Sequence, residues 1–598
     1  MLKLFLLIFL VTQVITTNIN KDEIRNRIFS GIHHYAKTGE KSLDFSDFLN
    51  SYSFKHAFRQ RPKHFVNYES LCDLCVPIVD AAIEERRNGL DAEDLVTMIV
   101  DLCVSMNIES KEVCEGAIKA NADPVIFIVD NKPDLSGSRV CGTVLQGSGC
   151  KSDSIPEWDI KIPEGTTIDV EKGLQSDSKP LKVLQITDIH YDPNYLPGSP
   201  ANCQEPLCCQ SDKGLAENED DAAGYWGDYR DCDSPRHVVI DAYEHINRVH
   251  DDIDYIYFTG DIIRHKVWNT SVESNLKEIQ TMFDDFEAHF PNIPIFSIFG
   301  NHEPHPVNVY APSVITDSLV STQWLYNQAA NLWGKYLPEE AQETIKKGGY
   351  YTTLIKPGLR IIGINSNIYY IQNWWLLYDN TQQIEQLQWL SDTLYEAEKN
   401  NEFVHILSHL PSGGGSAILS YSKAYRRILE RFSNTITAIF QGHTHHDQWV
   451  IFHHIEDNSP IGIVWDGGSL TTASNLNYNY KIYDVDQENF EVLDFESWTF
   501  NLTEANLTPN ISPNWFKQYS FKEAFGLDNA SPKSVKNLMY KMAQNHDLLQ
   551  IEYRHRYREA DSRGACDENC MKNNLCDMTK NEYGDDYACQ ELLSTWVN

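Results

Sequence analysis

Basic residues are scarce in this chain of 598 residues, and their scarcity restricts its partners. Lysine and arginine number 50 against 85 aspartates and glutamates, so the formal net charge at pH 7 is −35. Binding to nucleic acid requires Lys and Arg to neutralise phosphates, and so does attraction to an anionic membrane at neutral pH. We therefore expect no nucleic-acid partner. In an acidic compartment, protonation would remove part of this charge and weaken the repulsion.

Long apolar runs are also absent beyond the first residues. Residues 1–17 hold one lysine, a short apolar stretch and small polar residues, which predicts a signal peptide; the alternative is an N-terminal anchor helix. No later segment has 18 consecutive apolar residues, so we expect the mature chain not to span a membrane. The 14 cysteines then favour disulfides, in a secreted or lysosomal protein. Five N-x-S/T sites agree with this route: Asn269, Asn501, Asn506, Asn510 and Asn529.

Composition divides the rest of the chain into five parts, without an internal repeat. They are a polar leader that we expect to be poorly ordered (18–65), a six-cysteine helical segment (66–152), a linker rich in proline, glycine and charge (153–180), a segment of alternating strand and helix patterns (181–510) and a helical segment ending in four cysteines (511–598). In the second part, residues 78–90 and 91–104 have helical apolar spacing, and Asp91 is a candidate N-cap. No protein partner can be predicted.

In the large segment, five short apolar runs each end in a polar residue. The runs are 181–187, 255–259, 293–299, 403–408 and 435–440. Strands separated by helical stretches predict an α/β architecture, in which ligands bind beyond the carboxyl ends of the strands. The polar groups fall at that edge, as the motifs Asp188-x-His190, Gly260-Asp261, Gly300-Asn301-His302-Glu303, Ser408-His409 and Gly442-His443-Thr444-His445.

This ordered set of motifs resembles the calcineurin-like metallophosphoesterases. Each motif alone is typical of a turn or a buried core histidine, whereas five in order at strand ends indicate one site. The resemblance implies that Asp261 bridges two metal ions. It implies that one ion is completed by Asp188, His190 and His445, and the other by Asn301, His409 and His443.

Imidazole and carboxylate ligands favour two Zn²⁺ as the cofactors. Purple acid phosphatases of the same superfamily bind ferric iron through a tyrosine three residues after the bridging aspartate, but Arg264 stands there. Two histidines remain outside the ligand set. We predict that His302 is the general acid, because an imidazole can protonate an alkoxide leaving group, and that His265 orients the phosphate. The alternative for His265 is a structural role behind the ligands.

The six early cysteines in a helical segment resemble a saposin domain; the alternative is a disulfide-rich pro-segment. Joined to a calcineurin-like phosphoesterase, this arrangement resembles the acid sphingomyelinase family over about residues 66–598, including the tail 521–542. The resemblance implies the α/β metallophosphoesterase sandwich with an all-α saposin-type N-terminal domain and a helical, disulfide-bonded C-terminal domain. It also implies the disulfides Cys72–Cys150, Cys75–Cys141, Cys103–Cys114, Cys203–Cys208, Cys209–Cys232, Cys566–Cys570 and Cys576–Cys589.

The implied reaction is hydrolysis of sphingomyelin to ceramide and phosphocholine by a zinc-activated hydroxide. The implied partner is sphingomyelin in membranes or lipoproteins, reached by peripheral contact through the saposin-like domain. The alternatives are a nucleotide phosphodiesterase of the same superfamily and a non-catalytic lipid-binding protein. Two features depart from the family and affect substrate preference: no cysteine occurs between Cys232 and Cys566, and residues 475–480 read NLNYNY.

Overall fold

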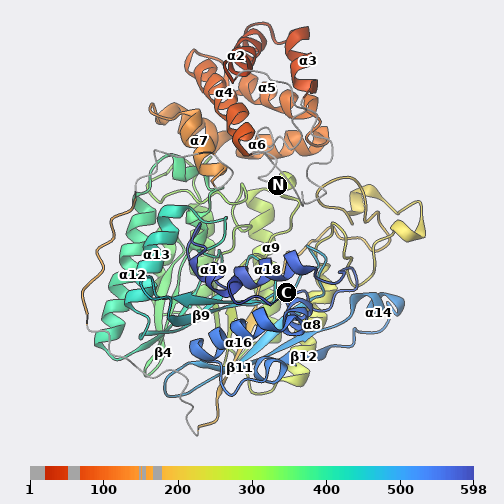
Figure 1. Ribbon diagram of the computed structural model, residues 1–598. Helices are drawn as coiled ribbons and strands as arrows, with labels where there is room; N and C mark the ends of the chain where they lie inside the picture. The colour runs from red at the N-terminus through yellow and green to blue at the C-terminus, as the bar shows by residue number, and fades with distance from the viewer. Residues whose placement is uncertain (1–20, 52–67, 147–149, 151–156, 166–177, 598) are drawn as a thin grey trace.

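The structure, a computed structural model, consists of a helical N-terminal domain set on a larger α/β body (Figure 1). It describes residues 21–51, 68–146, 150, 157–165 and 178–597. The predicted signal peptide lies outside these residues. Among the described helices, none combines the length and the hydropathy that a membrane span requires.

Two mixed six-stranded sheets form the α/β body. The first has the order β12 (Phe516–Ser520), β11 (Val492–Thr499), β10 (Asn479–Val485), β1 (Leu181–Ile186), β2 (Tyr255–Phe258) and β3 (Ile295–Ser297). The second has the order β4 (Tyr351–Lys356), β5 (Leu359–Gly363), β6 (Phe403–Leu407), β7 (Ile436–Gln441), β9 (Pro460–Asp466) and β8 (Trp449–His453). All five predicted strands are present as β1, β2, β3, β6 and β7, and the predicted α/β sandwich is confirmed.

The two sheets pack face to face around an aromatic core. The Tyr257 hydroxyl of β2 hydrogen-bonds to His405 Nδ1 of β6 at 2.8 Å, and the rings of Phe440 and Tyr483 lie 5.0 Å apart across the interface. Burial of such large apolar side chains is the main favourable term holding the sheets together. Helices accompany the strands: α8 (Arg236–Val249), α9 (Val272–His289), α10 (Gln323–Trp333), α11 (Ala341–Gly348), α12 (Thr381–Lys399) and α13 (Leu419–Arg431).

The C-terminal region is helical and disulfide-bonded, as predicted, and it shares this core. Its strand β12 extends the first sheet, and α16 packs against β8 and β9. Leu538 and Met542 of α16 are fully buried in the core of the sandwich. The predicted boundary at residue 510 therefore does not separate two hydrophobic cores. The helices here are α14 (Leu502–Leu507), α15 (Phe521–Phe525), α16 (Pro532–Gln544), α17 (His546–Arg556), α18 (Glu568–Asp577) and α19 (Tyr587–Leu593).

Four helices of the N-terminal domain match the predicted six-cysteine segment. They are α4 (Tyr68–Arg87), α5 (Ala92–Ser105), α6 (Lys111–Asn131) and α7 (Gly137–Val144). Asp91 caps α5 by accepting a hydrogen bond from the backbone N–H of Glu93. All seven disulfides that the family resemblance implied are present.

The described part of the leader, residues 21–51, does not match the prediction of a poorly ordered segment. It forms α2 (Lys21–Thr38) and α3 (Leu43–Ser51), which pack against α4 and α5. Ile28 and Ile32 are four residues apart on one face of α2, and both are buried in the core of the domain. A helix needs only one apolar face in order to pack, so a segment that is polar on average can still form a packed helix. The average composition of the leader therefore did not indicate the apolar spacing of α2.

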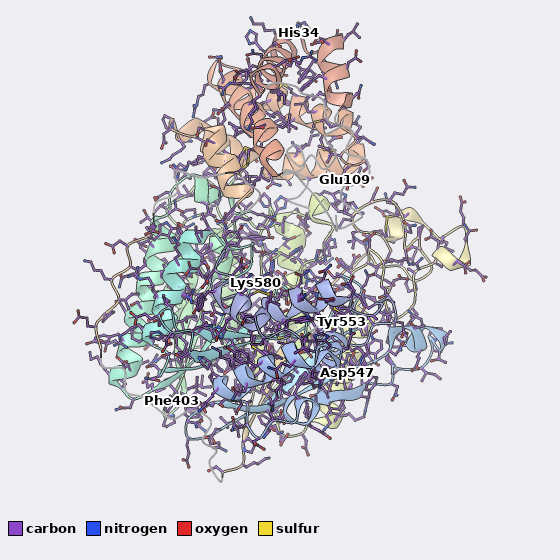
Figure 2. All side chains as sticks on the ribbon, in the orientation of Figure 1. His34, Glu109, Phe403, Asp547, Tyr553 and Lys580 are labelled. Atoms are coloured by element: carbon purple, nitrogen blue, oxygen red, sulfur yellow. A yellow bond between two sulfur atoms is a disulfide. The ribbon has the colours of Figure 1, made fainter. Side chains whose placement is uncertain are left out.

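The N-terminal domain meets the α/β body along α6. Trp374 Nε1, in the 3-10 helix η5 (Trp374–Leu377), donates a hydrogen bond to Asn121 Oδ1 at 2.8 Å. A Cβ atom at Gly116 would lie 2.3 Å from the carbonyl oxygen of Trp268, so only glycine permits this approach. Glu109, just before α6, lies near the junction (Figure 2).

The described part of the predicted linker, residues 157–165, packs against the α/β body. Trp158 is buried beside Tyr369, with ring centroids 5.9 Å apart. The backbone N–H and carbonyl of Lys161 both pair with the Gln388 side chain of α12 at 2.9 Å. Residues 157–165 therefore form part of the packed body.

Candidate metal centre

The carboxyl ends of parallel strands from both sheets converge at one edge of the sandwich. Asp188, Asp261 and Asn301 follow β1, β2 and β3, while His409 and His443 follow β6 and β7. Parallel pairing of β1 with β2, of β2 with β3 and of β6 with β7 puts these ends side by side. The structure therefore brings the predicted ligand groups together, as expected for an α/β sheet.

The backbone at this edge is held in an uncommon conformation. Asp188, His190, Asp261, His443 and His445 all have positive φ angles, from 44° to 71°. Such left-handed conformations in non-glycine residues cost free energy and cluster at functional sites, where sharp turns direct side chains inward.

One cluster combines Asp188, His190, Asp261 and His445, all buried. His190 Nε2 lies 3.0 Å from His445 Nε2 and 3.5 Å from Asp261 Oδ2. His190 Nδ1 pairs with the Ile263 carbonyl oxygen at 2.9 Å, which assigns the ring proton to Nδ1 and leaves a lone pair on Nε2. This lone pair faces His445 Nε2 and the Asp261 carboxylate, and this set of donors fits a metal ion.

A second cluster combines Asp261, His409 and His443 with the Asn301 amide. His409 Nε2 lies 3.2 Å from Asp261 Oδ2. Asn301 Oδ1 lies 3.1 Å from His409 Nε2 and 2.8 Å from His443 Nδ1. Asp261 belongs to both clusters, which is the arrangement that a bridging carboxylate requires. The seven predicted ligands thus form a cluster suited to two metal ions, in which only His443 is partly exposed.

Burial sets the protonation of most of the imidazoles. It lowers the pKa of His190 and of His445 well below the ordinary value, and burial together with His409 lowers the pKa of His443 to about 3. For His409, burial opposes protonation, but the charge and hydrogen bond of Asp261 outweigh it and raise the pKa to about 9. Three ligand imidazoles are therefore neutral at acid pH, which is the form that binds metal.

The carboxyl groups of Asp261 and Asp188 have opposite pKa shifts. Burial opposes ionisation of Asp261, but His409 and His302 hold its pKa well below the ordinary range. Burial raises the pKa of Asp188 to about 8, with His409 opposing. A bound cation would favour the ionised form of Asp188, so its protonation is expected to depend on the metal.

Both predicted non-ligand histidines lie beside these clusters. The backbone N–H of His302 donates to Asp261 Oδ1 at 2.8 Å, and its ring centroid lies 4.6 Å from that of His265. Both rings line an open cleft of about 380 Å³ together with Asn301, His443 and His445.

Asp233 is a functional candidate that the sequence motifs did not indicate. It is fully buried, and its Oδ1 pairs with His265 Nδ1 at 2.7 Å. Burial opposes protonation of His265, but the charge and hydrogen bond of Asp233 raise its pKa above the ordinary value. By contrast, burial lowers the pKa of His302 to about 3, with Asp261 opposing. Asp233 belongs to none of the strand-end motifs in the sequence, so only the tertiary structure reveals that it pairs with His265.

Glu303 is the last residue of the motif at residues 300–303 and lies outside the predicted ligand set. Its carboxylate accepts hydrogen bonds from the backbone N–H groups of Gly300, Asp261 and Ile262. It thereby joins the loops after β2 and β3, which carry Asp261 and Asn301. A carboxylate three residues after a glycine turn was a usable signal for this support.

Two family descriptions match consecutive parts of the chain. Residues 181–447 match the calcineurin-like phosphoesterases, and residues 465–593 match the C-terminal region of acid sphingomyelin phosphodiesterases. A sphingomyelin phosphodiesterase of Bos taurus is 33% identical over 530 residues, which cover 87% of this chain and 84% of that protein. The chain belongs to the acid sphingomyelinase family.

One further relative matches as much of this chain as the bovine protein does, and another matches less of it. The sphingomyelin phosphodiesterase of Homo sapiens is 32% identical, and the match covers 87% of this chain and 83% of that protein. A cyclic GMP-AMP phosphodiesterase of Mus musculus is 30% identical, and that match covers 65% of this chain and 87% of that protein. The family resemblance predicted from the motifs is confirmed.

Proposed function

We propose that this acid sphingomyelinase relative hydrolyses sphingomyelin to ceramide and phosphocholine. The observation that carries the proposal is the double cluster centred on Asp261, at an open cleft that His302 and His265 also line. Family membership over most of the chain supports the choice of substrate, because the bovine and human relatives are named sphingomyelin phosphodiesterases.

The proposed cofactors are two Zn²⁺, held by the residues that the family resemblance implies. Asp188, His190 and His445 would hold one ion, Asn301, His409 and His443 the other, and Asp261 both. When bound, two zinc ions supply Lewis acidity that polarises the phosphodiester and lowers the pKa of the attacking water. Mixed imidazole and carboxylate donors support zinc over magnesium or calcium, which take mainly oxygen ligands.

The proposed general acid is His302, which delivers a proton to the departing ceramide oxygen. Its backbone is anchored to Asp261, so its ring stays beside the reacting phosphate. An anionic phosphodiester in the cleft favours protonated imidazole, opposing the burial that lowers the pKa of His302. His265, held by Asp233, would stabilise and orient the phosphate as a neighbouring cation.

The N-terminal helices are proposed to handle lipid. Helices α4 to α7 enclose an apolar cavity of about 100 Å³, whose wall includes Trp374 and Leu377 of the α/β body. An apolar face next to the catalytic body would give peripheral contact with membranes or lipoproteins and admit acyl chains. We also propose secretion or lysosomal delivery, which the disulfides support.

A nucleotide phosphodiester is the second candidate substrate. The cyclic GMP-AMP phosphodiesterase of mouse favours it, because that relative matches 65% of this chain. A lipid headgroup and a nucleotide place the same phosphodiester in the cleft, so the distinction depends on the groups beyond the phosphate.

The test compares both substrates on one preparation. Phosphocholine release from sphingomyelin vesicles and cleavage of cyclic GMP-AMP are measured at about pH 5, with metal content determined by elemental analysis. The proposal predicts zinc and rapid sphingomyelin hydrolysis in the wild type, and loss of both in Asp261→Asn. Zinc-loaded protein that cleaves only the nucleotide would contradict the lipid substrate, while activity without zinc would contradict the metal assignment.

A further inference from the structure

A fully buried arginine from the C-terminal region contacts the loops of the metal centre. Arg558 follows α17 and has no exposed surface. Its guanidinium donates to the carbonyl oxygen of His445 and, at 3.0 Å, to Ser469 Oγ, while Nε donates to the carbonyl oxygen of Asn477 at 2.5 Å. One side chain therefore joins three separate segments.

These contacts surround a metal ligand rather than the substrate. His445 is a candidate ligand with φ of 60°. In the same loop, the backbone N–H of Asp447 donates a hydrogen bond to the carbonyl oxygen of Arg556 at 3.1 Å. Asn477 returns a hydrogen bond from Nδ2 to the carbonyl oxygen of Arg558 at 2.9 Å. The nearby residue Asn475 lines the cleft.

We infer that Arg558 is a positioning residue, which fixes the loop of His445 against residues 469–477 and so slows release of the bound metal. Burying a guanidinium is costly unless its donors are satisfied, and its planar fork suits several fixed acceptors at once. A lysine offers one ammonium group and cannot reach all three segments in the same geometry.

The test measures metal retention without substrate, so its outcome does not depend on which phosphodiester is cleaved. Purified wild type, Arg558→Met and Arg558→Lys are incubated with a chelator, and remaining metal is followed by elemental analysis. We expect release to be faster on the order of tenfold in Arg558→Met, with partial rescue in Arg558→Lys.

Arg556→Met is the matched control. Arg556 is also buried and lies two residues away, but its guanidinium pairs with Asp577 at 3.1 Å. Both Met variants should lose thermal stability, whereas only Arg558→Met should release metal faster. Equal release rates in wild type and both Arg558 variants, or equal acceleration in Arg556→Met, would overturn the inference.

A second inference concerns helices α2 and α3, and it rests on a different part of the molecule. Ile32 of α2 lines the apolar cavity of the N-terminal domain, together with Trp374 and Leu377 of the α/β body. Phe45 and Phe48 of α3 are buried against the same core. The apolar side chains of α4 and α5 are thus covered by a segment that precedes them in the chain.

Polar contacts fix the edge of this cover. Lys41 Nζ, between α2 and α3, pairs with Asp101 Oδ2 of α5 at 2.7 Å and contacts Ser105. His33 of α2 pairs with Glu85 of α4 at 2.7 Å. Ion pairs that are partly exposed contribute little each, so apolar contacts hold most of the cover. Apolar contacts are not directional, so a competing apolar surface can replace them.

We infer that α2 and α3 are an intramolecular cover over the apolar face of α4 and α5, and that a lipid bilayer must displace them to reach it. This inference rests on the proposed lipid contact of the N-terminal domain. It makes the leader a restraint on action at membranes without changing the metal centre.

The test uses full-length variants that weaken the cover. Lys41→Glu places like charges beside Asp101, and Phe45→Asp removes a buried ring; Lys37→Glu makes the same charge change at an exposed site of α2. Binding to vesicles of sphingomyelin and phosphatidylcholine is measured by sedimentation. Cleavage of water-soluble nitrophenyl phosphocholine reports on the metal centre, and hydrogen exchange in α2 reports on displacement.

Weakening the cover should raise vesicle binding and vesicle hydrolysis several-fold, with no change in cleavage of the soluble substrate. Lys37→Glu should behave as the wild type. Faster hydrogen exchange in α2 without increased vesicle binding would overturn the inference. Vesicle binding is measured separately from hydrolysis, so this result is distinct from failure of the proposed reaction.

Discussion

Replacing His302 by glutamine tests the proposed proton transfer most directly. The backbone N–H of His302, not its ring, holds the contact to Asp261 at 2.8 Å, so the substitution leaves that anchor in place. Its Nδ1 is buried and makes no hydrogen bond within the described part of the chain, so few side-chain contacts are lost. The variant should therefore fold and retain its metal.

The size of the effect depends on the leaving group. Ceramide leaves as an alkoxide that needs a proton, and a positioned general acid contributes about 10²–10⁴-fold to the rate. That range corresponds to roughly 2.7–5.5 kcal/mol of transition-state stabilisation. A nitrophenolate is stable without a proton, so its release should fall by less than about tenfold. His302→Gln should thus lose activity selectively on sphingomyelin.

The assay measures kcat/KM on sphingomyelin and on nitrophenyl phosphocholine for the wild type, His302→Gln and His265→Gln. Metal content is determined for each protein. His265→Gln should slow both substrates, because His265 is proposed to act on the phosphate that they share. Equal losses on both substrates in His302→Gln, with metal retained, would refute its role as general acid.

Three other changes have defined outcomes. Burial lowers the pKa of His405 to about 4, below the unfolded value of about 6.5. The neutral imidazole therefore favours the folded state above pH 6.5, and the free energy of unfolding falls by at most about 3 kcal/mol as pH drops toward 4. In His405→Gln the free energy of unfolding, measured at several pH values, should depend less on pH. Gly300→Ala places a Cβ 2.3 Å from the backbone nitrogen of Asp261, so metal content and activity should both fall, whereas unchanged metal content would contradict this account. Leu538→Ala should cost about 2–5 kcal/mol in urea unfolding, and a smaller cost would contradict a shared core.

The seven candidate ligands were predictable because the pattern is local. Each follows a short apolar run, and the runs form β1, β2, β3, β6 and β7. The apolar content and periodicity of a strand depend only on residues close together in the chain, so they can be read directly from the sequence. The disulfides needed the family resemblance as well, since cysteine spacing alone permits many pairings.

The leader shows a limit of composition. Its polar character predicted disorder, yet α2 packs through Ile28 and Ile32 on one face. A composition averaged over the segment hides an apolar stripe that a residue-by-residue helical pattern would reveal. The same limit applied to residue 510, where a change of composition did not mark the end of the shared core.

The sequence by itself determined the α/β body, the candidate ligand groups at its strand ends and, through its motifs, the family. Only the tertiary structure decided that Asp233 pairs with His265, that Arg558 bonds to the carbonyl oxygen of His445, and that α2 packs against α4 and α5. These contacts join segments far apart in the chain, and no local periodicity encodes them. They form because burial of apolar surface closes the fold, and buried polar groups must then find partners within it.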